Sequence, residues 1–138
     1  MKYFLALLIA LMVSANSIAL ATEIRHVEDE ITLELLPDDG EQLNYYNYNF
    51  GMVPVNFRHW VRFTITNNTR EDVRYVNSYI TGMFYSVNHY CFRTLRPKES
   101  CMAEIAFWPY QRGFYTGLFA IYFSGNNGLR INLQGQAF

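Results

Sequence analysis

The sequence predicts an all-β protein of the sandwich or barrel class, and three observations support that prediction. Several short segments alternate apolar and polar residues with a period of two, as half-buried strands do. Turn-forming residues separate these segments at intervals of roughly 8 to 12 residues. No segment after the first residues shows the helical period. We therefore expect an all-β sandwich or barrel built from several short strands.

A secretory signal peptide is predicted at residues 1–21. Lys2 and the apolar run 3–13 precede the small-residue pattern Ala19-Leu20-Ala21, which is typical of a cleavage site. An uncleaved anchor is the weaker alternative, because a spanning helix needs about 20 apolar residues. We expect the mature chain to start near Thr22, to fold as one domain without a transmembrane span, and to be exported to the periplasm or the cell exterior.

The charge of the chain is unevenly distributed. Residues 22–41 hold eight acidic residues against Arg25 alone, whereas nine basic residues face four acidic ones from Gln42 onward. The sequence therefore divides into an acidic N-terminal segment, 22–41, with one short strand, and a domain at 42–138. The acidic segment is either a solvated flank, as charge runs usually are, or a segment that lies across the basic domain.

Alternation predicts which side chains face the core. Strands are expected at 31–35 and 59–67, a turn at 37–40, and a hairpin around Gly125-Asn126-Asn127-Gly128, whose residues accept the positive φ that such a turn requires. The residues expected to face inward are Ile31, Leu33, Leu35, Val61, Phe63, Ile65, Cys101, Ala103, Ile105, Phe107, Phe119, Ile121, Phe123, Leu129, Ile131 and Leu133.

Cys91 and Cys101 are the two cysteines of the sequence. In an exported protein we expect them to form a disulfide, and two free thiols are the alternative. Neither the spacing of the cysteines nor the scattered histidines His26, His59 and His89 match a zinc site. We expect no metal and no cofactor.

The stretch FWPYQRGFYTG, residues 107–117, predicts a corner between two strands. Pro109 has no N–H and ends a strand ladder, and Gly113 and Gly117 give the backbone room to reverse. Tyr115 stands just before the next strand, where immunoglobulin-like sandwiches carry a tyrosine corner, although a core tyrosine without the corner hydrogen bond is the alternative.

Several motifs together resemble the Hydin-type ASH domain, an immunoglobulin-like module related to major sperm protein and common in exported bacterial proteins. The resemblance runs from about Tyr45 to Phe138 and rests on NFGMVPVN, VRFTITNNT, CFRTLRPKESC, IAFWPYQRGFYTG and INLQGQAF. It implies a seven-stranded sandwich with a binding or scaffolding role and no catalytic residues. Such modules often occur in tandem or attached to larger proteins, whereas here one module follows a signal peptide.

Enzymatic activity is not expected from the sequence. No serine lies in a G-x-S-x-G motif, the cysteines are expected to be bonded, and no glycine-rich phosphate loop is present. Only four carboxylates follow Glu41, and two of them, Glu71 and Asp72, are adjacent in an expected turn. A nucleic-acid partner is not expected either.

The leading hypothesis is a module that recognises a protein partner through one sheet face. Alternation places a set of mostly apolar and aromatic side chains at outward positions, where they are either exposed or covered by the 31–36 strand and the loops. Antiparallel pairing would bring Trp60 and Trp108 to the same end of the sheet, with Arg62 over one indole. The predicted binding residues are Trp60, Arg62, Met102, Trp108, Leu118 and Tyr122.

The alternative hypothesis is a module that binds a carbohydrate or an anionic surface. It uses the excess of arginine after Gln42 beside tyrosines such as Tyr45, Tyr46 and Tyr48. Asn67-Asn68-Thr69 also matches the N-glycosylation acceptor pattern, which has meaning only in a host that glycosylates such sites. The partner and the oligomeric state are not specified by the sequence.

Overall fold

The computed structural model describes residues 27–36 and 44–138, and for 27–29 and 86–88 the backbone alone. The predicted signal peptide and the predicted turn at 37–40 lie outside the described residues.

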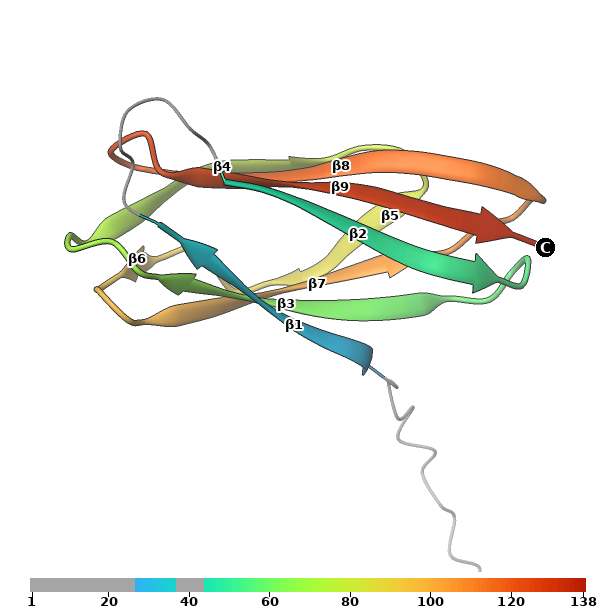
Figure 1. Ribbon diagram of the computed structural model, residues 1–138, viewed down its shortest axis with the longest axis horizontal. Coiled ribbons are helices and arrows are strands. Elements are labelled where there is room, and N and C mark those ends of the chain that lie inside the picture. The colour runs from blue at the N-terminus through green and yellow to red at the C-terminus, as the bar shows by residue number, and fades with distance from the viewer. Residues whose placement is uncertain (1–26, 37–43) are drawn as a thin grey trace, which may run out of the picture.

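Two sheets pack face to face and confirm the prediction of an all-β sandwich (Figure 1). Sheet I has the order β1-β3-β7-β5, and sheet II has the order β2-β9-β8-β4-β6. Nine strands are thus seen among the described residues, where about seven were expected. The strands of sheet I are β1 (Val27–Leu35), β3 (His59–Asn67), β7 (Ser100–Phe107) and β5 (Phe84–His89). Those of sheet II are β2 (Asn44–Val53), β9 (Gly128–Ala137), β8 (Gly113–Phe123), β4 (Val73–Ile80) and β6 (Thr94–Leu95).

The core lies between the sheets and follows the predicted alternation. Every residue expected to face inward is buried, apart from Ile31, which is half-buried against the core. The largest fully buried side chains include three phenylalanines, Phe63, Phe107 and Phe119. The β8–β9 hairpin also has the predicted turn, with φ of 73° at Gly125 and 58° at Asn126.

Strand β1 is a full member of sheet I. It pairs in parallel with β3, and its Leu33 and Leu35 side chains are buried in the core. The Tyr46 hydroxyl of β2 donates to the Glu34 carbonyl at 2.9 Å, and the Asn68 N–H donates to the Leu35 carbonyl at 2.9 Å. The described part of the acidic segment is therefore built into the sandwich rather than forming a solvated flank.

Asn67 of the glycosylation pattern is a buried structural residue. Its amide nitrogen donates to the carbonyls of Glu71 at 2.8 Å and Leu95 at 3.0 Å. Its amide oxygen accepts hydrogen bonds from the N–H and the hydroxyl of Thr69. Both ends of the side chain are engaged inside the fold, so the folded domain has no room for a glycan on Asn67.

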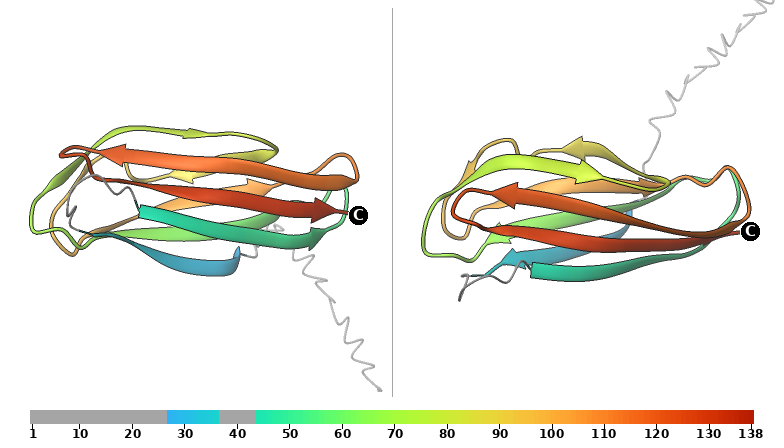
Figure 2. Two further views of the ribbon diagram at one scale, coloured as in Figure 1. Left: turned by 45° about the horizontal axis from the view of Figure 1, so that its top comes forward. Right: turned by 90° about the horizontal axis from the view of Figure 1, so that it is seen from above.

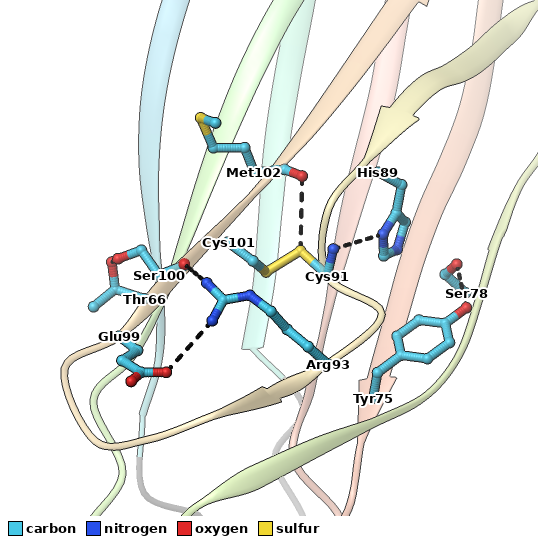
Figure 3. The surroundings of a disulfide bond; sticks show 10 residues. All are labelled: Thr66, Tyr75, Ser78, His89, Cys91, Arg93, Glu99, Ser100, Cys101 and Met102. Carbon is cyan, nitrogen blue, oxygen red and sulfur yellow. Dashed lines mark hydrogen bonds and ion pairs between the residues drawn. A yellow bond between two sulfur atoms is a disulfide. The ribbon is translucent and has the colours of Figure 1, made fainter.

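The predicted disulfide between Cys91 and Cys101 is confirmed (Figure 3). It joins the segment after β5 to the start of β7, with the two Cα atoms 5.1 Å apart. A closed loop of this size stabilises the fold by about 3 kcal/mol in the loop-entropy model. Arg93 fastens the same loop, because its guanidinium donates to the Ser100 carbonyl at 2.6 Å.

His89 packs beside the disulfide as a neutral ring. Its Nδ1 accepts the Cys91 N–H at 3.0 Å (Figure 3). Its ring stacks on Phe92 with centroids 4.4 Å apart. Burial disfavours the charged imidazolium and lowers the pKa of His89 below the ordinary 6.5. Protonation would also remove the Nδ1 acceptor from Cys91.

The free energy of unfolding should therefore decrease as the pH falls. Because the folded-state pKa of His89 is depressed, its contribution is complete above the unfolded-state value and is lost progressively as the pH falls through the folded-state value. Urea unfolding at about pH 7.5 and about pH 5 should show this loss in the parent and a smaller loss in His89→Asn, whose amide oxygen replaces Nδ1 without titrating. Equal losses in both proteins would show that other groups cause the effect.

The 107–117 stretch has the geometry of a tyrosine corner. The Tyr115 hydroxyl donates to the Gln111 carbonyl at 2.8 Å, and its ring lies 5.8 Å from that of Phe107. Gly113 has a φ of 147°, which side-chain-bearing residues rarely adopt. A Cβ on Gly117 would collide with the Thr81 carbonyl oxygen and the Phe84 ring. Pro109 is buried, and its carbonyl accepts the Asn56 N–H at 2.7 Å.

Tyr115→Phe should lower the free energy of unfolding by about 0.5–1.5 kcal/mol, since it keeps the ring and deletes one hydrogen bond. Thermal or urea unfolding measures the difference. Tyr110→Phe is the matched control, because Tyr110 is an exposed residue of the same loop. Unchanged stability in Tyr115→Phe would show that water replaces the corner bond without cost.

Candidate binding surfaces on the two sheets

The outer face of sheet I carries a tryptophan cluster, which we define as Arg58, Trp60, Tyr85 and Trp108. Trp60 of β3 and Tyr85 of β5 both lie opposite Ala106 of β7, and Trp108 follows the end of β7. The Arg58 guanidinium lies 4.7 Å from the ring centroid of Trp60 and 5.2 Å from that of Trp108. Both distances are within the range of a cation–π contact.

Contacts around Trp108 fix the half-exposed indole in place. Its Nε1 donates to the Asn56 carbonyl at 3.2 Å, and the Tyr85 hydroxyl donates to the Trp108 carbonyl at 3.4 Å. The Tyr85 ring meets the indole edge-on with centroids 6.5 Å apart. Trp108 is 45% exposed, so one surface of a positioned indole faces solvent.

Trp60 differs from the prediction, because it is only 6% exposed. The residue does lie on the outward side of β3, but Arg58 covers the ring from the preceding loop. The cation over the two indoles is therefore that of Arg58, whereas Arg62 was expected there. The two tryptophans do lie at the same end of the sheet, as antiparallel pairing predicted.

Arg62 is engaged in a partly buried ion pair. Its Nη2 lies 3.1 Å from Oε1 of Glu104, and Glu104 is among the buried residues. Arg62 lies opposite Glu104 across β3 and β7, two residues along each strand from the pair of Trp60 and Ala106. Met102, the next outward residue of β7, is exposed beside it. The charge of Arg62 is matched within the protein.

Leu118 and Tyr122 lie on the opposite face of the molecule. Both belong to β8 in sheet II, whereas Trp60, Arg62, Met102 and Trp108 belong to or directly follow strands of sheet I. The six predicted binding residues therefore cannot form one sheet face. Alternation gave the outward side of each strand correctly but could not assign the strand to a sheet.

A row of tyrosines crosses the outer face of sheet II. Tyr45 of β2 lies opposite Arg130 of β9, Arg130 lies opposite Ala120 of β8, and Ala120 lies opposite Tyr79 of β4. Arg130 Nε donates to the Tyr122 hydroxyl at 2.9 Å, and this hydrogen bond raises the pKa of Arg130. Sequence reasoning missed Arg130 and Tyr79, which only the strand order brings together.

A polar groove adjoins this row, with a volume of about 530 Å³. Asn132 Nδ2 donates to Asn47 Oδ1 at 3.1 Å across β9 and β2. The lining residues are Asn47, Thr81, Thr116, Gly117, Asn132, Leu133 and Gln134.

Two of the three tyrosines proposed for carbohydrate binding face the core instead. Tyr46 and Tyr48 both pack against it. The Tyr48 ring meets Phe50 and Phe63 edge-on at 4.9 Å and 5.5 Å. Tyr45 faces outward, because successive side chains of β2 point to opposite faces of the sheet and its neighbour Tyr46 faces the core.

Within residues 27–36 and 44–138, no group of three or more His, Cys, Asp or Glu side chains could hold a metal ion. The same part of the chain contains no helix long and apolar enough to cross a membrane.

Known proteins match this chain through structure and not through sequence. No protein-family model and no curated protein matches the sequence. The ASH/PapD-like domain 7 of human CEP192 superposes with a TM-score of 0.52 at 17% identity, over 70% of this chain and 84% of that domain.

Two Vibrio cholerae proteins also match, the secreted serine protease VesC and the protease VesB, each with a TM-score of 0.54 at 20% identity. They cover 64% and 66% of this chain, which spans only 21% of VesC and 30% of VesB. The chain therefore has the fold of an ASH-type, PapD-like domain, as its sequence motifs predicted.

Proposed function

We propose that this protein is an exported, non-catalytic module that binds a protein partner through the outer face of sheet I. The observation that carries the proposal is the half-exposed Trp108 indole, held by Asn56 and Tyr85 beside the Arg58 guanidinium. Tryptophan, tyrosine and arginine are the residue types that most often dominate the energy of protein interfaces.

Preorganisation makes this cluster more suitable than scattered surface aromatics. An indole already fixed by a hydrogen bond loses little conformational freedom on binding, so more of the burial energy appears as affinity. The buried Trp60 ring below Arg58 gives the guanidinium a firm support.

Loops at the same end of the sandwich extend the apolar surface. The Asn56 N–H bonds the Pro109 carbonyl and the Val55 N–H bonds the Phe138 carbonyl, which ties three segments together. Their exposed aromatic residues are Phe57, Tyr110 and Phe138. In Figure 1 this is the end at which the C-terminus lies. Exposed apolar patches of this kind mark interaction sites.

The disulfide supports the exported part of the proposal, because such bonds persist in oxidising compartments and are rare in the cytosol. The pairing of Glu104 with Arg62 supports the non-catalytic part, since this carboxylate is committed to an ion pair rather than aimed into a cleft.

The two tryptophans should respond differently to substitution. Trp60→Ala removes a buried ring and should lower the free energy of unfolding by about 3 kcal/mol or more. Trp108→Ala removes a half-exposed ring and should cost less than about 1 kcal/mol. Urea unfolding of the purified variants measures both values. A large loss in Trp108→Ala would assign that indole to the fold rather than to binding.

Trp108→Ala should also reduce partner capture about tenfold or more, as expected for an interface residue worth about 1.4 kcal/mol. The measurement is retention of one identified envelope protein on immobilised parent and variant chains. Tyr79→Ala is the matched control, because Tyr79 is 44% exposed on the opposite sheet. Capture should persist at high salt, since apolar burial is not screened. Equal retention by Trp108→Ala and the parent would contradict the proposal.

A further inference from the structure

The outer face of sheet II has a different chemistry from the tryptophan cluster. Its groove of about 530 Å³ is lined mainly by neutral amides and hydroxyls, and none of its lining side chains is charged. The groove lies on β2, β9 and β8, which run side by side in the right-hand view of Figure 2. We define the tyrosine–amide face as this groove together with Tyr45, Tyr79, Tyr122 and Arg130.

Hydrogen bonds within the groove leave matched donors and acceptors for a ligand. The Asn132–Asn47 bond uses one nitrogen and one oxygen, so Asn47 keeps its amide nitrogen and Asn132 its amide oxygen. The Thr81 hydroxyl accepts the Leu118 N–H at 3.0 Å, so its own O–H is left to donate. Such side chains pair with ligand groups that both donate and accept.

Tyrosine rings border the groove on one side. Tyr45 is 61% exposed and Tyr79 is 44% exposed, and they stand on β2 and β4 at the two ends of the cross-strand row. Because neighbouring strands are about 4.8 Å apart, the row spans about 14 Å. Ala120 lies fully buried in the middle of the row, so its small side chain does not rise above the face.

We propose that the tyrosine–amide face binds an oligosaccharide chain. Sugar hydroxyls both donate and accept hydrogen bonds, as the amides of Asn47 and Asn132 do. The apolar faces of sugar rings pack on exposed aromatic rings such as Tyr45 and Tyr79. An open groove across parallel rows of side chains fits an extended chain.

Other macromolecules fit this face less well. A nucleic acid needs several cations for its phosphates, whereas Arg130 is the one basic side chain of the tyrosine–amide face. A protein partner needs a desolvated apolar centre, whereas most of the residues that line this groove are amides or hydroxyls.

Arg130 gives the face a preference for an acidic sugar. Its guanidinium is oriented by the Tyr122 hydroxyl at 2.9 Å and lies over the Tyr122 ring at 5.8 Å. None of the residues of the tyrosine–amide face carries a carboxylate that would neutralise it. A sugar carboxylate or sulfate would pair with this cation.

The test uses the intact mature chain with tetragalacturonate as the acidic probe and cellotetraose and chitotetraose as neutral probes. Titration followed by NMR should shift the side-chain amide signals of Asn47 and Asn132, with the acidic probe binding most tightly. Asn132→Ala and Tyr79→Ala should each weaken binding roughly tenfold. Arg130→Gln should weaken binding of the acidic probe alone.

Matched controls separate this site from the tryptophan cluster. Tyr85→Ala and Trp108→Ala alter the opposite sheet and should leave oligosaccharide binding unchanged, whether or not they affect capture of a protein. Asn132→Asp keeps the size of the side chain and should abolish binding of the acidic probe by charge repulsion, so the test does not depend on a truncated variant.

Three outcomes would overturn the proposal. Failure of all probes to bind would do so, as would equal weakening by Tyr85→Ala and Tyr79→Ala. Loss of protein capture in Asn132→Ala would assign the face to a protein instead. Binding of neutral probes alone would support the oligosaccharide site and overturn the role given to Arg130.

Discussion

The close packing of the two sheets around Phe107 is the constraint on which most of the structure depends. The fully buried ring stacks on Phe84 at 5.0 Å and contacts Phe50 and Tyr115 at 5.7 Å and 5.8 Å. It also fills the space above Gly135, where any Cβ would collide with it. One side chain therefore connects strands β2, β5, β7, β8 and β9.

The position of Trp108 follows from this packing. Because Phe107 points into the core, the side chain of the next residue, Trp108, points to the outer side of the sheet. There Trp108 forms hydrogen bonds with Asn56 and Tyr85. The Tyr115 corner depends on the same ring from the other side. The candidate protein-binding indole is thus placed by the core residue that precedes it together with its hydrogen bond to Asn56.

Short stretches of the sequence predicted the features that depend on residues close together in the chain. The two-residue period identified the inward faces, Gly125 and Asn126 identified the hairpin, and the corner motif placed the Tyr115 turn. Features set by distant segments could not be predicted in this way. The parallel pairing of β1 with β3 and the placement of Leu118 in sheet II both depend on nonlocal contacts. An outward direction on a strand does not by itself mean exposure to solvent.

Each outer face has a buried alanine at the centre of a cross-strand row. Ala106 in sheet I and Ala120 in sheet II point away from the core, yet both are fully buried, because larger residues on neighbouring strands cover them. A small residue at the centre of a cross-strand row leaves room for the long side chains on either side of it. These are Trp60 and Tyr85 in sheet I, and Arg130 and Tyr79 in sheet II. Sheet I fills its row with apolar rings around a cation, and sheet II leaves amides and hydroxyls beside its row. Because the core separates the two faces, the two proposed sites do not share a surface, and a ligand at one would not compete with a ligand at the other.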